Sequence, residues 1–252
     1  MTRPTTQLLH SRARVRPRYA LFPIEGYPPS RLPHWTGAEA RVLTSPAMGA
    51  GFVQYLIHLQ PQGGTFCQAD HRIETFVYVL SGSLTLLLDE KHKHTMHEGG
   101  FAFVPHTTSY RIDSDHSSTI LLLKKVFEPA ADVPHPPAVV SNVAQVEAVI
   151  YQGDEGARLQ TLLPDDVRFD LAMNIFTFQP GRSLPVVETH VMEHGLYFLQ
   201  GRGMYYLDNE WMEVEALDFI WMGPYVPQSF YATGPTPSKY IYYKNVNRDI
   251  PL

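Results

Sequence analysis

Residues 196–201 read LYFLQG and repeat the pattern of residues 77–82, which read VYVLSG. Two further pairs of segments match in the same order: IFTFQPG at 175–181 with LIHLQPQ at 56–62, and DFIWMG at 218–223 with GFAFVP at 100–105. These apolar runs are short, rich in β-branched and aromatic residues, and bounded by Gly and Pro, which is typical of strands. An internal repeat of strand units indicates two similar domains.

The composition also favours strands and turns over helices. The 252 residues include 21 prolines and 17 glycines, too many for a helical bundle of this size. We therefore predict an all-β protein of two antiparallel, jelly-roll-like β-barrels with few helices. Four prolines within Glu128–Pro137 favour a boundary there. The expected division is an arm at 1–40, a first barrel at 41–128, a linker at 129–150 and a second barrel at 151–252. Within the first barrel, we expect a turn at Pro61–Gly64.

Charge and cysteine content narrow the classes of partner and compartment. The formal net charge is −5, and no long basic stretch is present, so we expect no nucleic-acid partner. No apolar run approaches the ~18 residues that span a bilayer, so we expect no membrane partner either. The single cysteine, Cys67, cannot form an intrachain disulfide. We predict a cytoplasmic protein, and the exposed apolar strands expected at barrel edges favour a homo-oligomer.

The strongest functional signal is the segment PVVETHVMEHG at 185–195. Glu188 and His190 are two residues apart and would share one face of an extended strand. His194 follows four residues later, and Gln228 comes after the last repeated segment. Two imidazoles, a carboxylate and an amide oxygen form a mixed nitrogen and oxygen ligand set that suits Mn(II) or Fe(II) better than structural zinc. The alternative is a group of polar residues at strand ends.

The same segment resembles the first cupin motif, in which a Gly is followed by His-x-His, then Glu, then Gly. Residues 218–228 resemble the second motif, which ends in the fourth metal ligand. Relative to that pattern, Glu188 replaces the first His, His194 replaces the Glu, and Gln228 replaces the last His. Leu217 stands where the second motif has a Gly.

These departures, together with the tail YIYYKNVNRD at 240–249, resemble the (S)-ureidoglycine aminohydrolase family of bicupins. The resemblance extends over nearly the whole chain, including LTSPAMGA at 43–50 and DNEW at 208–211. It implies a C–N hydrolase that converts (S)-ureidoglycine and water to (S)-ureidoglycolate and ammonia in purine and allantoin breakdown. It further implies a small-molecule ureide substrate and Mn2+ as cofactor, although the sequence also allows another divalent transition metal.

The resemblance implies roles for three residues. Lys244 would bind substrate and act in catalysis as the proton-transfer group, and Tyr205 would contact the substrate. Glu188 would bind both metal and substrate and take part in catalysis. Without the resemblance, Lys244 reads as an exposed lysine at a strand end and Tyr205 as a core aromatic. Rival functions are a cupin Fe(II) dioxygenase or isomerase acting on a small acid, and a non-enzymatic ligand-binding cupin.

The first half lacks this ligand set. The repeat aligns Glu188, His190 and His194 with Ala69, His71 and Thr75, and places the fourth ligand near Ser109 or Tyr110. We therefore expect the first barrel to have no intact metal site and to act as scaffold and interface.

Overall fold

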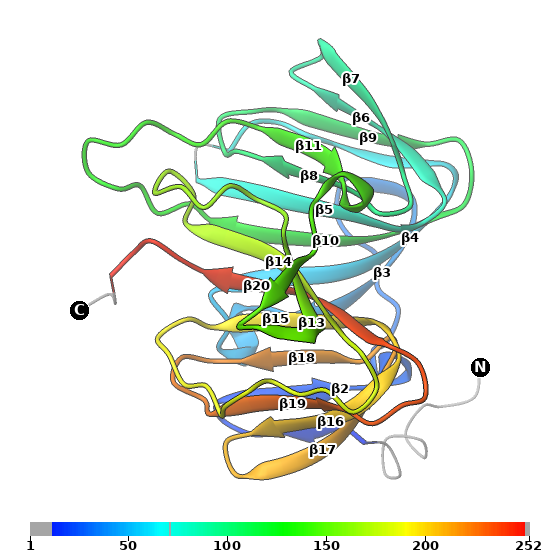
Figure 1. Ribbon diagram of the computed structural model, residues 1–252. Helices are drawn as coiled ribbons and strands as arrows, with labels where there is room; N and C mark the ends of the chain where they lie inside the picture. The colour runs from blue at the N-terminus through cyan, green and yellow to red at the C-terminus, as the bar shows by residue number, and fades with distance from the viewer. Residues whose placement is uncertain (1–11, 71, 250–252) are drawn as a thin grey trace. The chain divides into compact units, whose positions relative to one another are not determined.

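The computed structural model describes residues 12–70 and 72–249 (Figure 1). These residues form strands and turns, and the only helices among them are the 3-10 turns η1 (Ile24–Gly26), η2 (Pro46–Met48) and η3 (Val143–Gln145). No helix in the described part of the chain is long and apolar enough to cross a membrane. The expected all-β architecture with few helices is confirmed.

The chain divides into two compact units. The N-terminal unit contains Pro28–Val146 and Asp166–Asp170. The C-terminal unit contains Glu147–Asp165 and Leu171–Leu252, together with the described residues up to Tyr27.

The N-terminal unit is built on one antiparallel sheet in the order β11-β8-β5-β10-β4-β9-β6-β7, with β3 paired to β4. Its strands are β3 (Trp35–Thr44), β4 (Phe52–Cys67), β5 (Ile73–Ser81), β6 (Ser83–Leu88), β7 (His92–His97), β8 (Gly100–Val104), β9 (Tyr110–Ser114), β10 (Ser118–Val126) and β11 (Val139–Asn142). The long strand β4 joins the two parts of this sheet, because it pairs with β10 along its first half and with β9 along its second half.

The prediction of a turn at Pro61–Gly64 is wrong, because these residues lie inside β4. The chain does bend there: Gln62 has a φ of 64°, in the left-handed region. A Cβ on Gly64 would lie 2.1 Å from the carbonyl oxygen of Ile112, so only glycine allows the neighbouring strand this close. The glycine signal marks a bend within a continuous strand, not the end of one.

The C-terminal unit contains an eight-stranded sheet, β1-β2-β18-β15-β20-β14-β13-β12, and a three-stranded sheet, β17-β16-β19. Its strands are β1 (Arg14–Val15), β2 (Tyr19–Phe22), β12 (Val149–Tyr151), β13 (Asp154–Thr161), β14 (Leu171–Phe178), β15 (His194–Gln200), β16 (Arg202–Leu207), β17 (Glu210–Glu215), β18 (Phe219–Met222), β19 (Gln228–Ala232) and β20 (Ser238–Asn245).

The units differ from the expected division at both flanks. In the part of 1–40 that the structure describes, β2 pairs with β18 of the C-terminal unit, and β3 begins at Trp35 in the N-terminal unit. Residues 129–150 contain β11, which pairs with β8, and the start of β12. The strands β2, β11 and β12 have four residues or fewer and form by pairing with neighbouring strands, so their own sequence carries no clear strand pattern.

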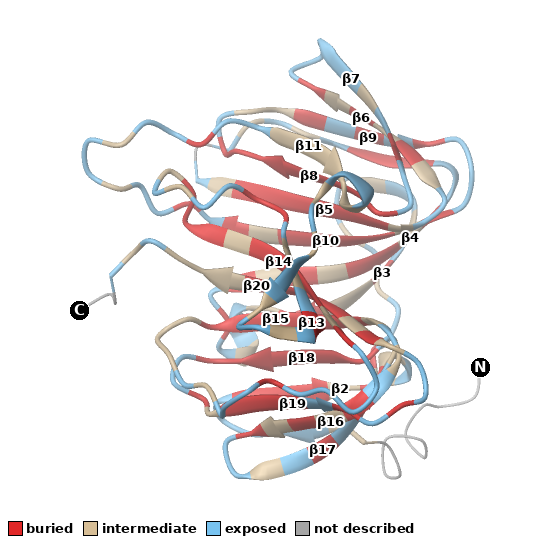
Figure 2. Ribbon diagram, viewed as in Figure 1, coloured by how far each residue is buried: buried red, intermediate tan, exposed pale blue. Residues whose placement is uncertain are grey.

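Both units repeat one strand order. The series β8-β5-β10-β4 in the N-terminal unit corresponds to β18-β15-β20-β14 in the C-terminal unit, and β7-β6-β9 corresponds to β17-β16-β19. Buried residues run along the central strands of each unit (Figure 2). Each unit therefore has its own hydrophobic core inside its own barrel.

Candidate metal and active site

Two paired strands of the C-terminal unit bring a histidine and a lysine together. His194 at the start of β15 pairs with Lys244 of β20. Directly opposed residues in an antiparallel pair point to the same face, and so do alternate residues along a strand. Tyr242 and Tyr240 therefore follow Lys244 on that face, and all four side chains line one cavity.

A short bridge positions the other two predicted ligands. Glu188 lies in the loop before β15 and Gln228 begins β19. The Glu188 N–H donates to the Gln228 carbonyl and the Gln228 N–H donates to the Glu188 carbonyl, each at 2.8 Å. This exchange of backbone hydrogen bonds makes the two residues direct cross-strand neighbours. An irregular loop thus holds Glu188 as firmly as a strand would.

The two imidazoles face each other through their Nε2 atoms, which are 3.2 Å apart. The Nδ1 atom of His194 lies 2.9 Å from the carbonyl oxygen of Tyr243. Because a carbonyl only accepts, this Nδ1 carries the proton and the Nε2 presents a lone pair. Burial, with a further contribution from His190, lowers the pKa of His194 to about 3, so its ring is neutral near neutral pH.

Gln228 is held between a tyrosine and a histidine. The Tyr205 hydroxyl donates to Gln228 Oε1 at 2.7 Å, and Gln228 Nε2 lies 3.2 Å from His190 Nε2. Burial raises the pKa of Tyr205 well above its usual value, so the hydroxyl keeps its proton and remains a donor. Tyr205 therefore holds the amide beside the imidazoles, with its oxygen at the phenol and its nitrogen towards His190.

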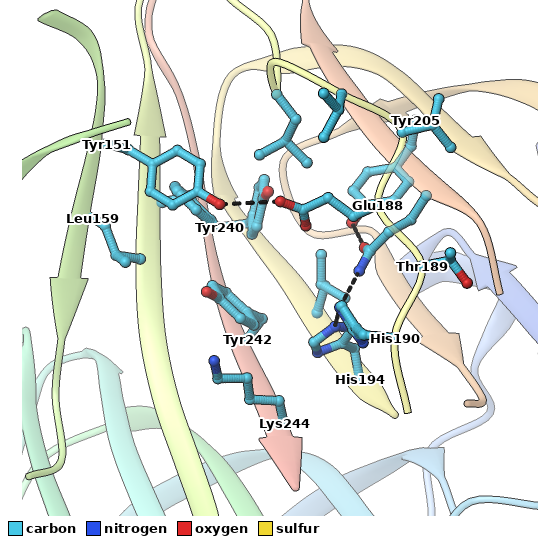
Figure 3. A pocket seen from close by; sticks show the side chains of 16 residues that line it. Tyr151, Leu159, Glu188, Thr189, His190, His194, Tyr205, Tyr240, Tyr242 and Lys244 are labelled. Carbon is cyan, nitrogen blue, oxygen red and sulfur yellow. Dashed lines mark hydrogen bonds between the residues drawn. The ribbon is translucent and has the colours of Figure 1, made fainter. Parts of the chain in front are cut away.

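The Glu188 carboxylate accepts a hydrogen bond from the hydroxyl of Tyr151 at 3.0 Å (Figure 3). Burial and the neighbouring Glu188 charge raise the pKa of Tyr151 to about 12, which keeps this phenol protonated. Tyr151 also packs edge-on against Phe176, with ring centroids 4.8 Å apart. A tyrosine from β12 thus orients Glu188, the only carboxylate among the described residues that line the cavity.

The chemistry of this donor set fits a divalent transition metal. In the described part of the chain, no three His, Cys, Asp or Glu side chains form a ready-made metal cluster. The two imidazoles with converging Nε2 atoms, the oxygen of the Gln228 amide and the Glu188 carboxylate nevertheless supply nitrogen and oxygen donors. Metal-binding histidines typically donate their other ring nitrogen to a carbonyl or carboxylate, as His194 does. Glu188, His190, His194 and Gln228 are the residues that could hold the ion.

The cavity has a volume of about 530 Å³, within the range of small-molecule sites. All six side chains predicted from the sequence line it: Glu188, His190, His194, Tyr205, Gln228 and Lys244. In the described residues the Lys244 ammonium has no ion pair, although it lines a cavity that also contains a carboxylate. The lysine is therefore available to a ligand in this cavity.

The sequence analysis missed three tyrosines that line the cavity: Tyr151, Tyr240 and Tyr242. The alternation of Tyr240, Tyr242 and Lys244 along one strand was a usable signal, since period-two spacing places them on one face. No signal marked Tyr151, because β12 is an edge strand of three residues.

Comparison with known proteins agrees with this description. The cupin domain family matches residues 174–243. The chain is 36% identical to (S)-ureidoglycine aminohydrolase of Escherichia coli (strain K12), covering 97% of this chain and 95% of that protein. It is 32% identical to the (S)-ureidoglycine aminohydrolase of Arabidopsis thaliana, covering 92% and 76%. The crystal structure of a putative glyoxylate induced protein from Pseudomonas aeruginosa superposes with a TM-score of 0.88 at 34% identity, covering 96% and 94%.

Two repeated antiparallel barrels, one with a mixed imidazole, carboxylate and amide site, define a two-domain cupin. Within that class, the identity and coverage above show that the chain belongs to the (S)-ureidoglycine aminohydrolase family.

Proposed function

We propose that the cavity of the C-terminal unit releases ammonia from (S)-ureidoglycine, with a divalent metal as cofactor. The reaction adds water to the carbon that bears the amine and gives (S)-ureidoglycolate. The observation that carries the proposal is that all six residues implied by the family resemblance line one cavity of suitable size. The names of the relatives support the substrate.

Glu188, His190, His194 and Gln228 would hold the ion. When bound, it supplies positive charge that polarises the substrate and draws its carboxylate to a fixed place. The ligand set suits Mn2+, because a carboxylate and an amide oxygen are hard donors and the two imidazoles are borderline. The bond from Tyr151 would keep Glu188 in position, and the Tyr205 hydroxyl would hold the Gln228 amide once its oxygen is turned towards the ion.

Lys244 would handle the proton that the leaving amine needs. Its ammonium lines the cavity with no ion pair among the described residues, so it can approach the substrate amine and donate a proton as the C–N bond breaks. The attacking water must lose a proton to balance the reaction, and Glu188 is the carboxylate in the cavity that could accept it. The roles are thus an acid at Lys244 Nζ and a base at the Glu188 carboxylate.

The tyrosines would bind the ureido group. Burial raises the pKa of Tyr240 and Tyr242, as it does for Tyr205, so all three remain neutral donors and acceptors. A ureido group has both N–H donors and a carbonyl acceptor, and phenol hydroxyls can satisfy either. Their rings also limit water in the cavity, which strengthens the polar contacts made there.

The edge strand β12 supports the expected homo-oligomer. Val149 and Ile150 are 46% and 45% exposed on this strand, which has a partner on one side only. An apolar edge strand is a common site of association between copies.

The test is ammonia release from freshly prepared (S)-ureidoglycine by the manganese-loaded protein. We expect release above the spontaneous rate, with formation of the S product. Glu188→Ala should abolish release, because it removes a donor and the base together. Glu155→Ala, at an exposed carboxylate on β13 of the same unit, is the matched control and should retain full activity.

Two results would contradict the proposal. The first is ammonia release no faster than the spontaneous rate by protein that contains stoichiometric metal. The second is full activity in Glu188→Ala. In the first case, oxygen consumption by iron-loaded protein would test the dioxygenase alternative.

A further inference from the structure

The N-terminal unit has a cavity of its own, of about 300 Å³. Apolar side chains of Phe52, Val53 and Ile73 form much of its wall. The polar groups that line it include the Cys67 thiol, the Thr75 hydroxyl and the Lys124 ammonium. An apolar wall with a few polar groups is the usual composition of a small-molecule site.

Strand register relates this cavity to the one in the C-terminal unit. Lys124 of β10 pairs with Thr75 of β5, as Lys244 of β20 pairs with His194 of β15. Cys67 pairs with Tyr110, as Glu188 pairs with Gln228. The sequence repeat had instead aligned Glu188 with Ala69, and the predicted counterpart His71 lies outside the described residues. The lysine is therefore retained at the matching position, whereas a thiol, a hydroxyl and a phenol replace three of the metal ligands.

These replacements leave no metal ligand set like that of the C-terminal unit among the described residues. Thr75 and Tyr110 are neutral oxygen groups, and Tyr110 is buried. Of the three replacing side chains, only the Cys67 thiol is a common metal ligand. The cavity therefore favours a ligand that is held by charge and apolar contact.

The charges around the cavity single out Lys124. Its ammonium has no ion pair or hydrogen bond among the described residues. The adjacent Lys125 is buried and paired with Asp170 and Glu128. Asp70 is exposed, and its carboxylate accepts a hydrogen bond from the Arg72 N–H in the turn before β5. One cation beside an apolar wall is thus available to an anionic ligand.

We propose that this cavity binds a short-chain monocarboxylate without a metal. The carboxylate pairs with the Lys124 ammonium and with the Thr75 hydroxyl, and the hydrocarbon part lies against Val53 and Ile73. This inference does not depend on the reaction proposed for the C-terminal unit.

Cys67 provides a direct test, because it lines the cavity and is the only cysteine of the chain. The rate at which Cys67 reacts with a chromogenic disulfide reagent would be measured in the full-length protein as isobutyrate is added. The protein would carry no added metal, and ionic strength would be held constant with chloride. We expect isobutyrate to slow the reaction in a saturable way, and the neutral isostere isobutyramide to have at most a weak effect.

Two lysine variants locate the site. In Lys124→Met, half-protection should need about tenfold more isobutyrate, because a charge-assisted hydrogen bond is lost. Lys124→Gln should show the same loss of protection. Agreement between the two variants would exclude a folding defect that only the methionine causes. Lys244→Met is the matched control and should leave protection unchanged.

The proposal is overturned if isobutyrate does not slow the Cys67 reaction in the wild-type protein. It is equally overturned if isobutyramide protects as well as isobutyrate, or if both Lys124 variants, with unchanged thermal unfolding, are protected like the wild type. If Lys244→Met loses ammonia release but isobutyrate still protects Cys67, the result supports both proposals and shows that the two cavities act independently.

Discussion

The two barrels share one strand order but have different interiors. At matching register positions, the N-terminal unit has Leu86, Ile120 and Leu122 where the C-terminal unit has Tyr205, Tyr240 and Tyr242. All six side chains are buried. The same backbone frame therefore encloses an aliphatic core in one unit and a cavity rimmed by phenols in the other.

This difference shows that one copy of a repeated fold can have an interior that only stabilises the barrel, while the other copy also lines a ligand cavity. Aliphatic side chains fill space and need no hydrogen bonds, so they close the interior. A tyrosine buries a large ring and keeps a hydroxyl that needs a partner, so it stabilises the barrel and also faces a ligand. In the C-terminal unit those hydroxyls lie next to the imidazoles, the amide and the lysine.

We expect the largest effect on activity when a metal ligand of the C-terminal unit is replaced by the residue at the matching position of the N-terminal unit. His194→Thr copies Thr75 and removes an imidazole whose Nε2 faces that of His190. Since changing a second-layer partner of a metal ligand already costs about 10–100-fold, we expect loss of a ligand to lower activity by more than about 10³-fold. Metal content by elemental analysis and ammonia release would be measured together. Normal metal content and activity would remove His194 from the ligand set.

The two lysines provide the next comparison. We expect Lys244→Met to lower kcat by about 10²–10³-fold, because a general acid contributes on that scale. Lys124→Met, at the matching position in the other unit, should retain normal ammonia release. Steady-state kinetics would be measured on both variants. Equal losses of kcat would mean that the two lysines support the structure and that Lys244 is not the general acid.

Tyr151→Phe should have a smaller effect. It deletes the hydrogen bond to Glu188 and keeps the ring packed against Phe176. We expect metal affinity or kcat/KM to fall about tenfold, as for other partners of a metal ligand. A metal titration and kinetics at saturating metal would separate the two causes. A variant with unchanged values for both would show that Tyr151 does not orient Glu188.

The smallest effect concerns a turn that the two barrels share. Leu217, two residues before β18, has a φ of 77°. Gly99, directly before β8, has the same φ. A left-handed conformation costs a non-glycine residue about 1–2 kcal/mol, and the chain entropy that glycine loses offsets part of this. We expect Leu217→Gly to raise the free energy of unfolding by about 0.5–1 kcal/mol.

Denaturant unfolding would measure this change. The reciprocal substitution, Gly99→Leu, should destabilise the protein by more, because a Cβ there would also lie 2.8 Å from a methyl group of Val143. A destabilised Leu217→Gly variant would mean that exposed Leu217 makes a contact that outweighs its backbone strain.

The sequence by itself determined the repeat, the all-β class and six of the side chains that line the cavity. Period-two alternation fixes which residues of a strand share a face, so segments such as 196–201 predicted strands that the structure confirms. The unusual order of Glu188, His190 and His194 was likewise visible, because the ligand types and their spacing are properties of the chain.

Only the tertiary structure decided what pairs with what. The strand β2 joins β18, almost two hundred residues away, and Tyr151 meets Glu188 from an edge strand of three residues. The register of Cys67 with Tyr110 differs from the sequence repeat because Cys67 precedes Thr75 by eight residues, whereas Glu188 precedes His194 by six. Such contacts depend on loop length and on the burial available when distant strands meet, and neither quantity is encoded in any local pattern.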